Sequence, residues 1–259
     1  MIKIISGWSH IGGSTFAHIN LCNLLNERGL ECIFYGPHDW HMGKCKSGML
    51  QNLSYEKDDI VISHFLDITE RPPVKKHILS LHEKELFPLK NRPIFVYDKI
   101  HYLNHQQRLW HGVKAPFFIC QNVVQEIDCL PSPEKGVAGI IGTINSNKQT
   151  HISIDRALAD GMDNVLLFGN IGDKDYFEKE IIPRLCDKVK YAGFTTNKAL
   201  LYSLISDVYL SSLSENASLV ADECKMLDKK FHGNSNITVK ADVMNNNQIF
   251  DCWFKELVK

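Results

Sequence analysis

Short apolar runs alternate with longer amphipathic segments along the whole chain. Runs rich in β-branched residues are typical of buried strands, and the amphipathic segments between them are typical of crossover helices. This alternation predicts an α/β protein with parallel sheets. The expected strands are 3–7, 31–35, 59–64, 77–82, 94–97 and 116–121 in the first half, then 137–141, 164–168, 188–191 and 208–210.

The clearest unit is the opening strand, glycine loop and helix. Ser14 or Thr15 is expected to cap this helix, which should end near Arg28-Gly29 with a glycine in the left-handed conformation. Later segments of helical periodicity predict helices at 150–159, 176–186, 197–206, from about 217, and 248–258.

A Pro/Ser-rich segment, 129–135, interrupts the alternation, which then restarts. We therefore expect an N-terminal domain over 1–133 and a second domain over 134–245. The terminal helix, 246–259, is able to pack back on the first domain.

The charge is almost balanced, with 29 Lys+Arg against 30 Asp+Glu and a net charge of −1. This does not favour a protein dominated by attraction to nucleic-acid phosphates, although a local basic groove stays open. The chain enters a strand-like run at once and has no apolar stretch of membrane-spanning length, so a cytoplasmic protein is expected. Eight cysteines without a C-x-x-C pair predict reduced structural thiols.

Three segments carry candidate chemistry. Gly12 and Gly13 join the first strand to a helix, where backbone N–H groups can face an anion; a tight turn explains the same residues. The spacing fits neither G-x-G-x-x-G nor a Walker loop. In the second segment, Gly142 and Thr143 end a strand and Lys148 follows six residues after the glycine. That lysine either neutralises a diphosphate or is a solvated surface group.

The third segment holds two glutamates at the junction after strand 208–210. On one continuous helix, Glu215 and Glu223 would lie about 12 Å apart along the axis. That distance resembles the span from the sugar to the ribose of a nucleotide-sugar, and carboxylates accept hydrogen bonds from vicinal diols. Between them, the N–H groups of Asn216, Ala217 and Ser218 can face a diphosphate. Two solvated helix glutamates are the alternative.

The order of these segments resembles the nucleotide-binding domain of retaining GT-B glycosyltransferases, especially the family-4-like group. The resemblance covers about 137–223 and rests on Leu167-Phe168-Gly169, Val189 to Gly193, Ser206 to Leu210 and the two glutamates. It implies a GT-B fold, with two Rossmann-like domains whose parallel sheets face each other across a cleft.

The resemblance also implies roles. Glu215 would hold donor-sugar hydroxyls, Glu223 the ribose diol, and Lys148 the departing diphosphate. Phe194 would frame the nucleobase, together with the backbone after Gly193. From the first domain, Gly12 and Gly13 would approach the donor, and His82 resembles the histidine that faces the donor sugar, with His64 as its competitor.

The chain departs from the family in three places. Thr143 stands where the family usually has arginine, so part of the diphosphate clamp is missing or is supplied by Lys198 or Arg156. Asn-Ala-Ser replaces the glycine-rich stretch after the first glutamate. The segment that follows Glu223 is shorter than is usual.

No metal is expected. Asp173-Lys174-Asp175 precedes a predicted helix, and capping explains it better than metal binding. His38, His41 and Cys45, or His101 with His105, lack a convincingly spaced fourth zinc ligand. The UDP- or GDP-sugar would be a co-substrate rather than a cofactor.

The prediction is a retaining glycosyltransferase. Its acceptor would be a cell-surface glycan, a small hydroxylated molecule or, with lower weight, a hydroxymethylated base in phage-type duplex DNA. A basic face with Trp40 and Trp110 available for stacking would suit DNA, but solvated loops explain the basic residues better. These residues are Lys44, Lys46, Arg71, Lys75, Lys76, Lys90 and Arg92. A non-catalytic nucleotide-sugar sensor and an NAD-linked Rossmann enzyme stay as alternatives.

Overall fold

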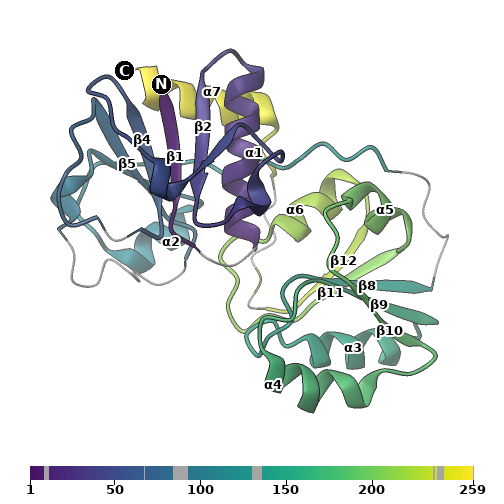
Figure 1. Cartoon of the computed structure of the whole chain (residues 1–259). Coiled ribbons are helices and arrows are strands. Elements are labelled where there is room, and N and C mark those ends of the chain that lie inside the picture. Colours follow the sequence, from purple (N-terminus) through teal and green to yellow (C-terminus); the bar gives the residue numbers. More distant parts are fainter. Residues whose placement is uncertain are drawn as a thin grey trace. The chain divides into compact units, whose positions relative to one another are not determined.

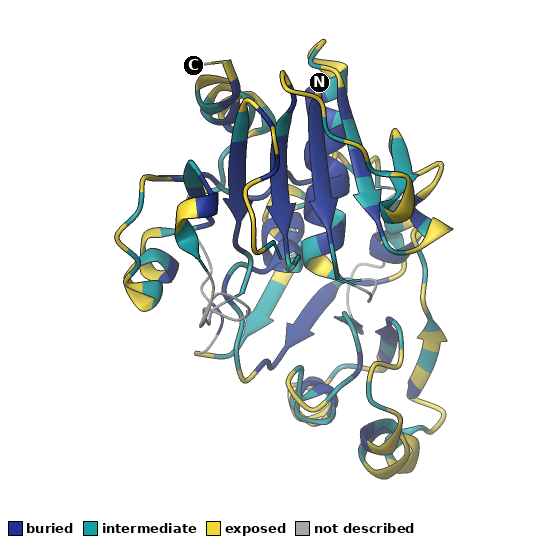
Figure 2. Cartoon of the chain, turned by 60° about the vertical axis from the view of Figure 1, so that its left-hand side comes forward, coloured by how far each residue is buried: buried dark blue, intermediate teal, exposed yellow. Residues whose placement is uncertain are grey.

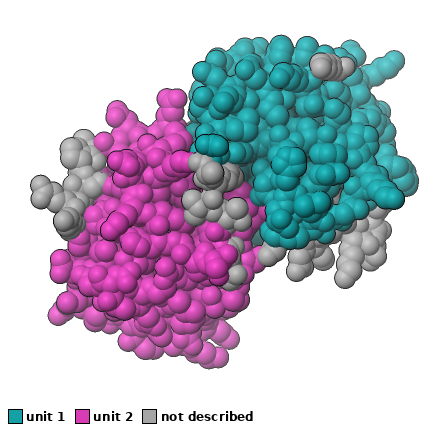
Figure 3. Space-filling model, turned by 180° about the vertical axis from the view of Figure 1, so that it is seen from behind, with its two compact units in different colours: residues 1–124, 242–259 teal, residues 125–241 magenta. Residues whose placement is uncertain are grey.

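The computed structural model describes residues 1–8, 12–66, 68–83, 93–129, 136–235, 237 and 242–258 (Figure 1). The chain forms two compact units (Figure 3). The first unit is Met1–Val124 with Asp242–Lys259, and the second unit is Gln125–Ala241.

The first unit is built on a seven-stranded sheet in the order β3-β2-β1-β4-β5-β6-β7, and all its neighbouring strands are parallel. β1 is buried along its whole length because a parallel sheet is covered on both faces; Figure 2 shows the central strands in dark blue. The strands are β1 (Ile2–Ser6), β2 (Cys32–Gly36), β3 (Ser47–Met49), β4 (Ile60–His64), β5 (Lys76–Ser80), β6 (Lys99–Tyr102) and β7 (Phe117–Ile119).

Helix α1 (Gly13–Glu27) begins earlier than the sequence indicated. Its N-cap is Gly12, in an extended conformation without a side-chain hydrogen bond, so the expected cap at Ser14 or Thr15 was wrong. Both residues lie inside the first turn. The helix ends as predicted, with Gly29 at φ +80° after the C-cap residue.

The expected strand at 94–97 is also wrong. Ile94–Val96 is a short 3₁₀ turn, and the strand that pairs with β5 is β6, a few residues later. Val96 and Tyr97 are buried in the core without joining the sheet, which explains why an apolar run indicated a strand. The short strand β3 and the later strand β12 (Lys230–Gly233) were not predicted.

The terminal helix α7 (Asn246–Val258) belongs to the first unit. Trp253 is 1% exposed and packs edge-on against Phe118, with ring centroids 5.0 Å apart. The backbone carbonyl of Glu256 accepts a hydrogen bond of 2.6 Å from Lys76. The sequence placed the domain boundary after residue 133, within a segment outside the described residues, whereas the compact units divide after Val124.

The second unit has a five-stranded parallel sheet in the order β10-β9-β8-β11-β12. Its first four strands are β8 (Val137–Ile141), β9 (Asn164–Phe168), β10 (Val189–Gly193) and β11 (Asp207–Leu210). Because all strands run the same way, their carboxyl ends meet at one edge, which we call the carboxyl edge.

Four helices connect these strands, and α3 (Thr150–Ala159) has the predicted bounds. α4 (Lys174–Tyr176) continues through a π turn to a 3₁₀ turn at Ile182–Arg184, where Pro183 cannot extend a regular helix. α5 (Lys198–Ser203) and α6 (Leu219–Met226) follow β10 and β11. None of the helices in the described residues combines the length and the apolar character that a membrane crossing requires.

Candidate functional site

Three glycines mark the carboxyl edge of the second unit. Gly142, Gly169 and Gly193 have φ of +140°, +153° and +84°, which side-chain-bearing residues rarely adopt. A Cβ on Gly169 would lie 1.8 Å from the carbonyl oxygen of Gly142, so the close approach of these two loops leaves no room for a side chain at Gly169. Glycine is therefore required at Gly169 both by its conformation and by its surroundings.

Lys148 and Glu215 form an ion pair at this edge although they are 67 residues apart. Both side chains are largely buried, 25% and 16% exposed. Ser212 donates a 3.3 Å hydrogen bond to the same carboxylate oxygen. The loops are also joined by their backbones, because the Leu213 N–H donates to the Asn147 carbonyl at 2.8 Å. The structure thus brings together two residues that the sequence proposed separately.

Glu223 lies inside α6 and is 3% exposed. Lys198 pairs with one carboxylate oxygen, and the Tyr202 hydroxyl donates to the other at 2.7 Å. Burial and the neighbouring Glu223 charge raise the pKa of Tyr202 well above its ordinary value, so the hydroxyl stays a donor. Neither Glu215 nor Glu223 is therefore a solvated helix glutamate.

The helix between the two glutamates starts later than expected. α6 begins at Leu219 and is capped by Ser218, whose hydroxyl accepts from the Ala221 N–H at 3.2 Å. Glu215 lies in the loop before the helix, so the 12 Å calculated for one continuous helix does not apply. Asn216, Ala217 and Ser218 lie in this loop, where Asn216 and Ser218 are 6% and 4% exposed.

The remaining predicted residues of the second unit also lie at its carboxyl edge. Thr143 follows Gly142 and packs its methyl group against Gly172. Phe194 follows Gly193 and is 41% exposed. Arg156, one candidate for the missing arginine, donates to the Ser211 hydroxyl at 2.8 Å and therefore braces the end of β11.

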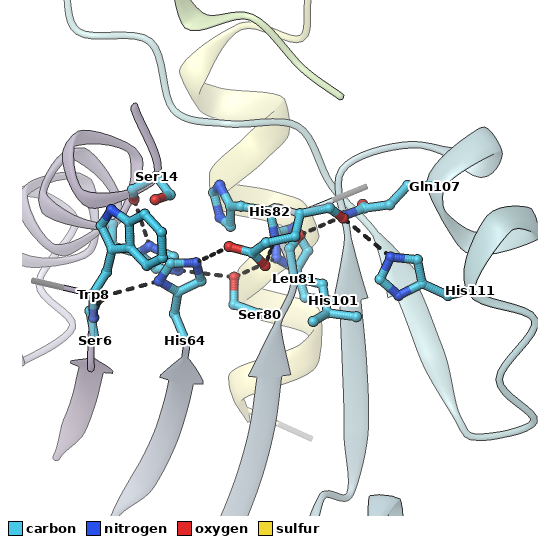
Figure 4. Close-up of polar contacts among 12 residues, drawn as sticks. Ser6, Trp8, Ser14, His64, Ser80, Leu81, His82, His101, Gln107 and His111 are labelled. Carbon is cyan, nitrogen blue, oxygen red and sulfur yellow. Dashed lines mark hydrogen bonds and ion pairs between the residues drawn. The ribbon is translucent and has the colours of Figure 1, made fainter. Parts of the chain in front are cut away.

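In the first unit, His82 lies beside a hydrogen-bonded pair of side chains (Figure 4). His64, which is fully buried, contacts a carboxylate oxygen of Glu83 at 2.8 Å through Nε2 and Ser6 Oγ at 3.1 Å through Nδ1. The second oxygen of Glu83 accepts from the backbone N–H of His82 at 3.1 Å. The ring centroids of His64 and His82 lie 5.2 Å apart, so the two histidines that the sequence offered as alternatives belong to one cluster.

The charge of Glu83 is stabilised within this cluster. Burial opposes ionisation, but hydrogen bonds from His64 and from backbone N–H groups bring the pKa of Glu83 below its ordinary value. Helix α2 (His105–His111) helps to position Glu83, because the buried Gln107 side chain donates a hydrogen bond of 2.9 Å to the backbone carbonyl of Glu83.

Sequence reasoning missed His18, Ser80 and the role of His101. His18 lies on α1 with its ring 4.5 Å from that of His82. Its Nε2 contacts Ser80 Oγ at 3.0 Å, and His101 contacts the same hydroxyl at 3.0 Å. Burial lowers the pKa of His18 and brings the pKa of His101 to about 4, so both are neutral near pH 7. The sequence signal that could have identified His18 was its position among the apolar residues of the first helix.

The glycines at the start of α1 are not required by packing within the described chain. An added Cβ at Gly13 would meet no atom within 4 Å, and one at Gly12 would only touch Trp8 at 4.0 Å. A donor-facing role for Gly12 and Gly13 stays a prediction.

The other sequence candidates have structural roles. Asp173 caps α4, accepting from the Tyr176 N–H at 3.0 Å, as predicted. His41 contacts the Gly48 carbonyl at 3.1 Å, and no group of three or more His, Cys, Asp or Glu side chains in the described residues is arranged to hold a metal ion.

Several residues of the predicted basic face are neutralised. Arg71 makes two 2.8 Å hydrogen bonds to Asp98, and Lys46 pairs with Glu31 at 3.0 Å. Lys90 and Arg92 lie outside the described residues. Arg71 and Lys46 are therefore not unpaired positive charges.

No protein-family model and no curated protein sequence matches the chain. Solved structures do match over nearly the full length. Anabaena HepE in complex with UDP and glucose has a TM-score of 0.67 at 11% identity, covering 100% of this chain and 89% of that one. WaaG, a glycosyltransferase of lipopolysaccharide biosynthesis, has a TM-score of 0.65 at 10% identity and coverages of 100% and 91%. AviGT4, of avilamycin A biosynthesis, has a TM-score of 0.63 at 15% identity and coverages of 97% and 88%. Together with the two parallel sheets, these similarities show that the chain has a GT-B fold with two Rossmann-like units.

Proposed function

We propose that this protein is a retaining glycosyltransferase that moves a sugar from a nucleoside-diphosphate sugar, such as a UDP- or GDP-sugar, to an acceptor hydroxyl. The observation that carries the proposal is the Lys148–Glu215 pair at the carboxyl edge of the second unit. Ligands of open α/β sheets bind at this edge, and an ammonium group beside a carboxylate matches a ligand with a diphosphate beside a polyhydroxylated ring.

The two side chains would act at the two sides of the breaking bond. Lys148 would neutralise the diphosphate as it leaves, and Glu215 would accept hydrogen bonds from sugar hydroxyls while stabilising the developing oxocarbenium charge. A largely buried pair performs this better than solvated groups, because charge interactions strengthen when water is excluded.

Retention would follow from attack on the same face that the diphosphate leaves. The bond from the anomeric carbon to the phosphate oxygen breaks, the acceptor oxygen bonds to that carbon, and the acceptor proton passes to the departing phosphate. This route needs no carboxylate nucleophile. Glu223 is poorly suited to be one, because Lys198 and Tyr202 occupy both of its oxygens.

In the first unit, His82 and the Glu83–His64 pair would contact the donor sugar or the acceptor. A glycan or a small hydroxylated molecule is the favoured acceptor, because described basic side chains such as Arg71 and Lys46 are ion-paired. Duplex DNA would be supported only by salt-dependent binding at low ionic strength.

The test is turnover of a panel of nucleotide-sugars, beginning with UDP-glucose, which HepE binds. Release of the nucleoside diphosphate and the anomeric configuration of the product are both measured. Glu215→Gln should lower turnover by roughly 10²–10³-fold, whereas Glu178→Gln, at a half-exposed position on the helical turn after α4, should not. Undiminished turnover in Glu215→Gln refutes the proposal. Binding without turnover in the wild type favours a sensor, and a response to NAD alone favours the NAD-linked alternative.

A further inference from the structure

Glu223 is held by side chains from a neighbouring helix rather than left open for a ligand. Lys198, the first residue of α5, is 16% exposed and pairs with one carboxylate oxygen of Glu223. Tyr202, one turn further along α5, donates to the other oxygen at 2.7 Å. Figure 1 shows α5 and α6 close together on one side of the sheet. A hydroxyl that binds the first oxygen of this 3%-exposed carboxylate competes with the ammonium group for it.

The same arrangement occurs at the other glutamate. One oxygen of Glu215 is held by both Lys148 and Ser212. Each of the two carboxylates is therefore neutralised by a lysine from another segment, Glu215 by Lys148 and Glu223 by Lys198. Two positive and two negative side chains compensate one another, so the four groups present little net charge to an approaching ligand.

This pairing makes partial ligands unfavourable. Removing one partner from a buried ion pair leaves the other charge unpaired in a poorly solvated place, which is strongly destabilising. A nucleoside brings hydroxyls for Glu223 but nothing for the displaced Lys198. Pyrophosphate brings charge for Lys198 but nothing for Glu223. A molecule with both a diol and a diphosphate can satisfy every group at once.

We propose that Lys198 is a specificity-determining residue of the donor site. On binding, it exchanges the Glu223 carboxylate for the ligand's diphosphate, while the ribose diol takes its place on Glu223. Lys198 then supplies a positive charge from the start of α5, which Thr143 after β8 does not. The site thereby selects complete nucleoside diphosphates over nucleosides or pyrophosphate. This inference rests on the proposed function and adds the residue that discriminates against fragments.

The exchange predicts opposite effects of two variants. Lys198→Met removes the competitor of the ribose diol and the partner of the diphosphate, so nucleoside affinity should rise and nucleoside diphosphate affinity should fall by about tenfold. Glu223→Gln releases Lys198, so pyrophosphate affinity should rise and nucleoside affinity should fall. A merely structural lysine would not change two affinities of one variant in opposite directions.

The experiment first identifies which of UDP, GDP, ADP, CDP and dTDP binds the full-length protein most tightly. Calorimetry then gives dissociation constants for that diphosphate, its nucleoside and inorganic pyrophosphate, with weak ligands measured by competition. Lys188→Met is the matched control, since this exposed lysine precedes β10 at the opposite edge of the sheet. Circular dichroism checks that each variant is folded, and Glu223→Gln carries the test if Lys198→Met is not.

The outcomes separate this inference from the proposed function. Lys198→Met decides the test if it is folded, and Glu223→Gln decides it otherwise. Opposite shifts of the two affinities in the deciding variant support the exchange. Shifts in the same direction, or a shift in at most one of the two affinities, overturn it, as does a nucleoside that binds neither the wild type nor Lys198→Met at 10 mM. The proposed function survives those results if a nucleotide-sugar is still turned over; failure of every nucleoside diphosphate to bind would overturn both.

Discussion

Acidification should destabilise the first unit through its buried histidines. His77 and His101 are 0% and 2% exposed, and burial lowers the pKa of each to about 4. The ordinary histidine pKa is about 6.5, so at intermediate pH the unfolded chain binds protons that the folded protein does not. Stability is therefore highest above about pH 6.5 and falls as the pH approaches 4.

The magnitude follows from the two pKa values. Between pH 7.5 and pH 5, each histidine should cost about 2 kcal/mol of unfolding free energy, and the two together about 4 kcal/mol. His18 acts in the same direction, because burial also lowers its pKa. Carboxylates contribute little in this range, since their unfolded pKa values lie near 4.

The assay is urea unfolding followed by tryptophan fluorescence at both pH values. All four tryptophans, Trp8, Trp40, Trp110 and Trp253, belong to the first unit, so the signal reports that unit. A loss of less than about 1 kcal/mol, or a gain, would refute the reasoning.

A variant assigns the effect to its source. His101→Gln should reduce the difference between the two pH values by about 2 kcal/mol, whatever its effect on stability at either pH. His105→Gln is the control, because that side chain is exposed. Equal pH dependence in the wild type and His101→Gln would show that His101 is not the source.

Two further predictions concern packing. Gly169→Ala combines a left-handed φ with a collision at the Gly142 carbonyl and should lower the unfolding free energy by more than about 3 kcal/mol. The Cβ of Gly142→Ala meets no atom within 4 Å, so this variant should lose only the strain of about 1–3 kcal/mol. Equal losses of unfolding free energy in chemical unfolding would contradict the close approach. Trp253→Ala should destabilise the first unit by about 3–5 kcal/mol. Phe254 is 41% exposed, so Phe254→Ala should destabilise it by less than about 1 kcal/mol. A small effect of Trp253→Ala in thermal or urea unfolding would show that α7 is only loosely attached.

The strands and helices of the second unit were largely predictable because the apolar residues that each element buries form a recognisable pattern within that element's own sequence. The α3 helix and strands β8 and β9 fall at the predicted residues. Prediction failed where an apolar segment is buried in the core but does not pair with a strand of the sheet. The run at 94–97 is apolar because it enters the core, yet β6 supplies the hydrogen bonds of the sheet. Short β3 and β12 contain glycine and polar residues, which weakens any strand pattern.

The candidate site was predictable as a set of residues but not as a set of contacts. Spacing after strands identified Lys148, Glu215 and Glu223 one by one. Which lysine pairs with which glutamate depends on the packing of loops and helices distant in sequence, so neither ion pair was predicted. His18 on α1 was missed for the same reason, because its partner Ser80 comes from β5, 62 residues later.

In the proposed function, the second unit binds a nucleotide-sugar through Lys148 and Glu215. The most direct test is calorimetric titration of the protein with the nucleotide-sugar it prefers, comparing the wild type with Lys148→Met and the control Lys188→Met. Loss of a charge-assisted contact to the diphosphate should weaken binding by about tenfold or more in Lys148→Met, while the control binds like the wild type. Wild-type affinity in Lys148→Met, or no binding of any nucleotide-sugar to the wild type, would contradict the account.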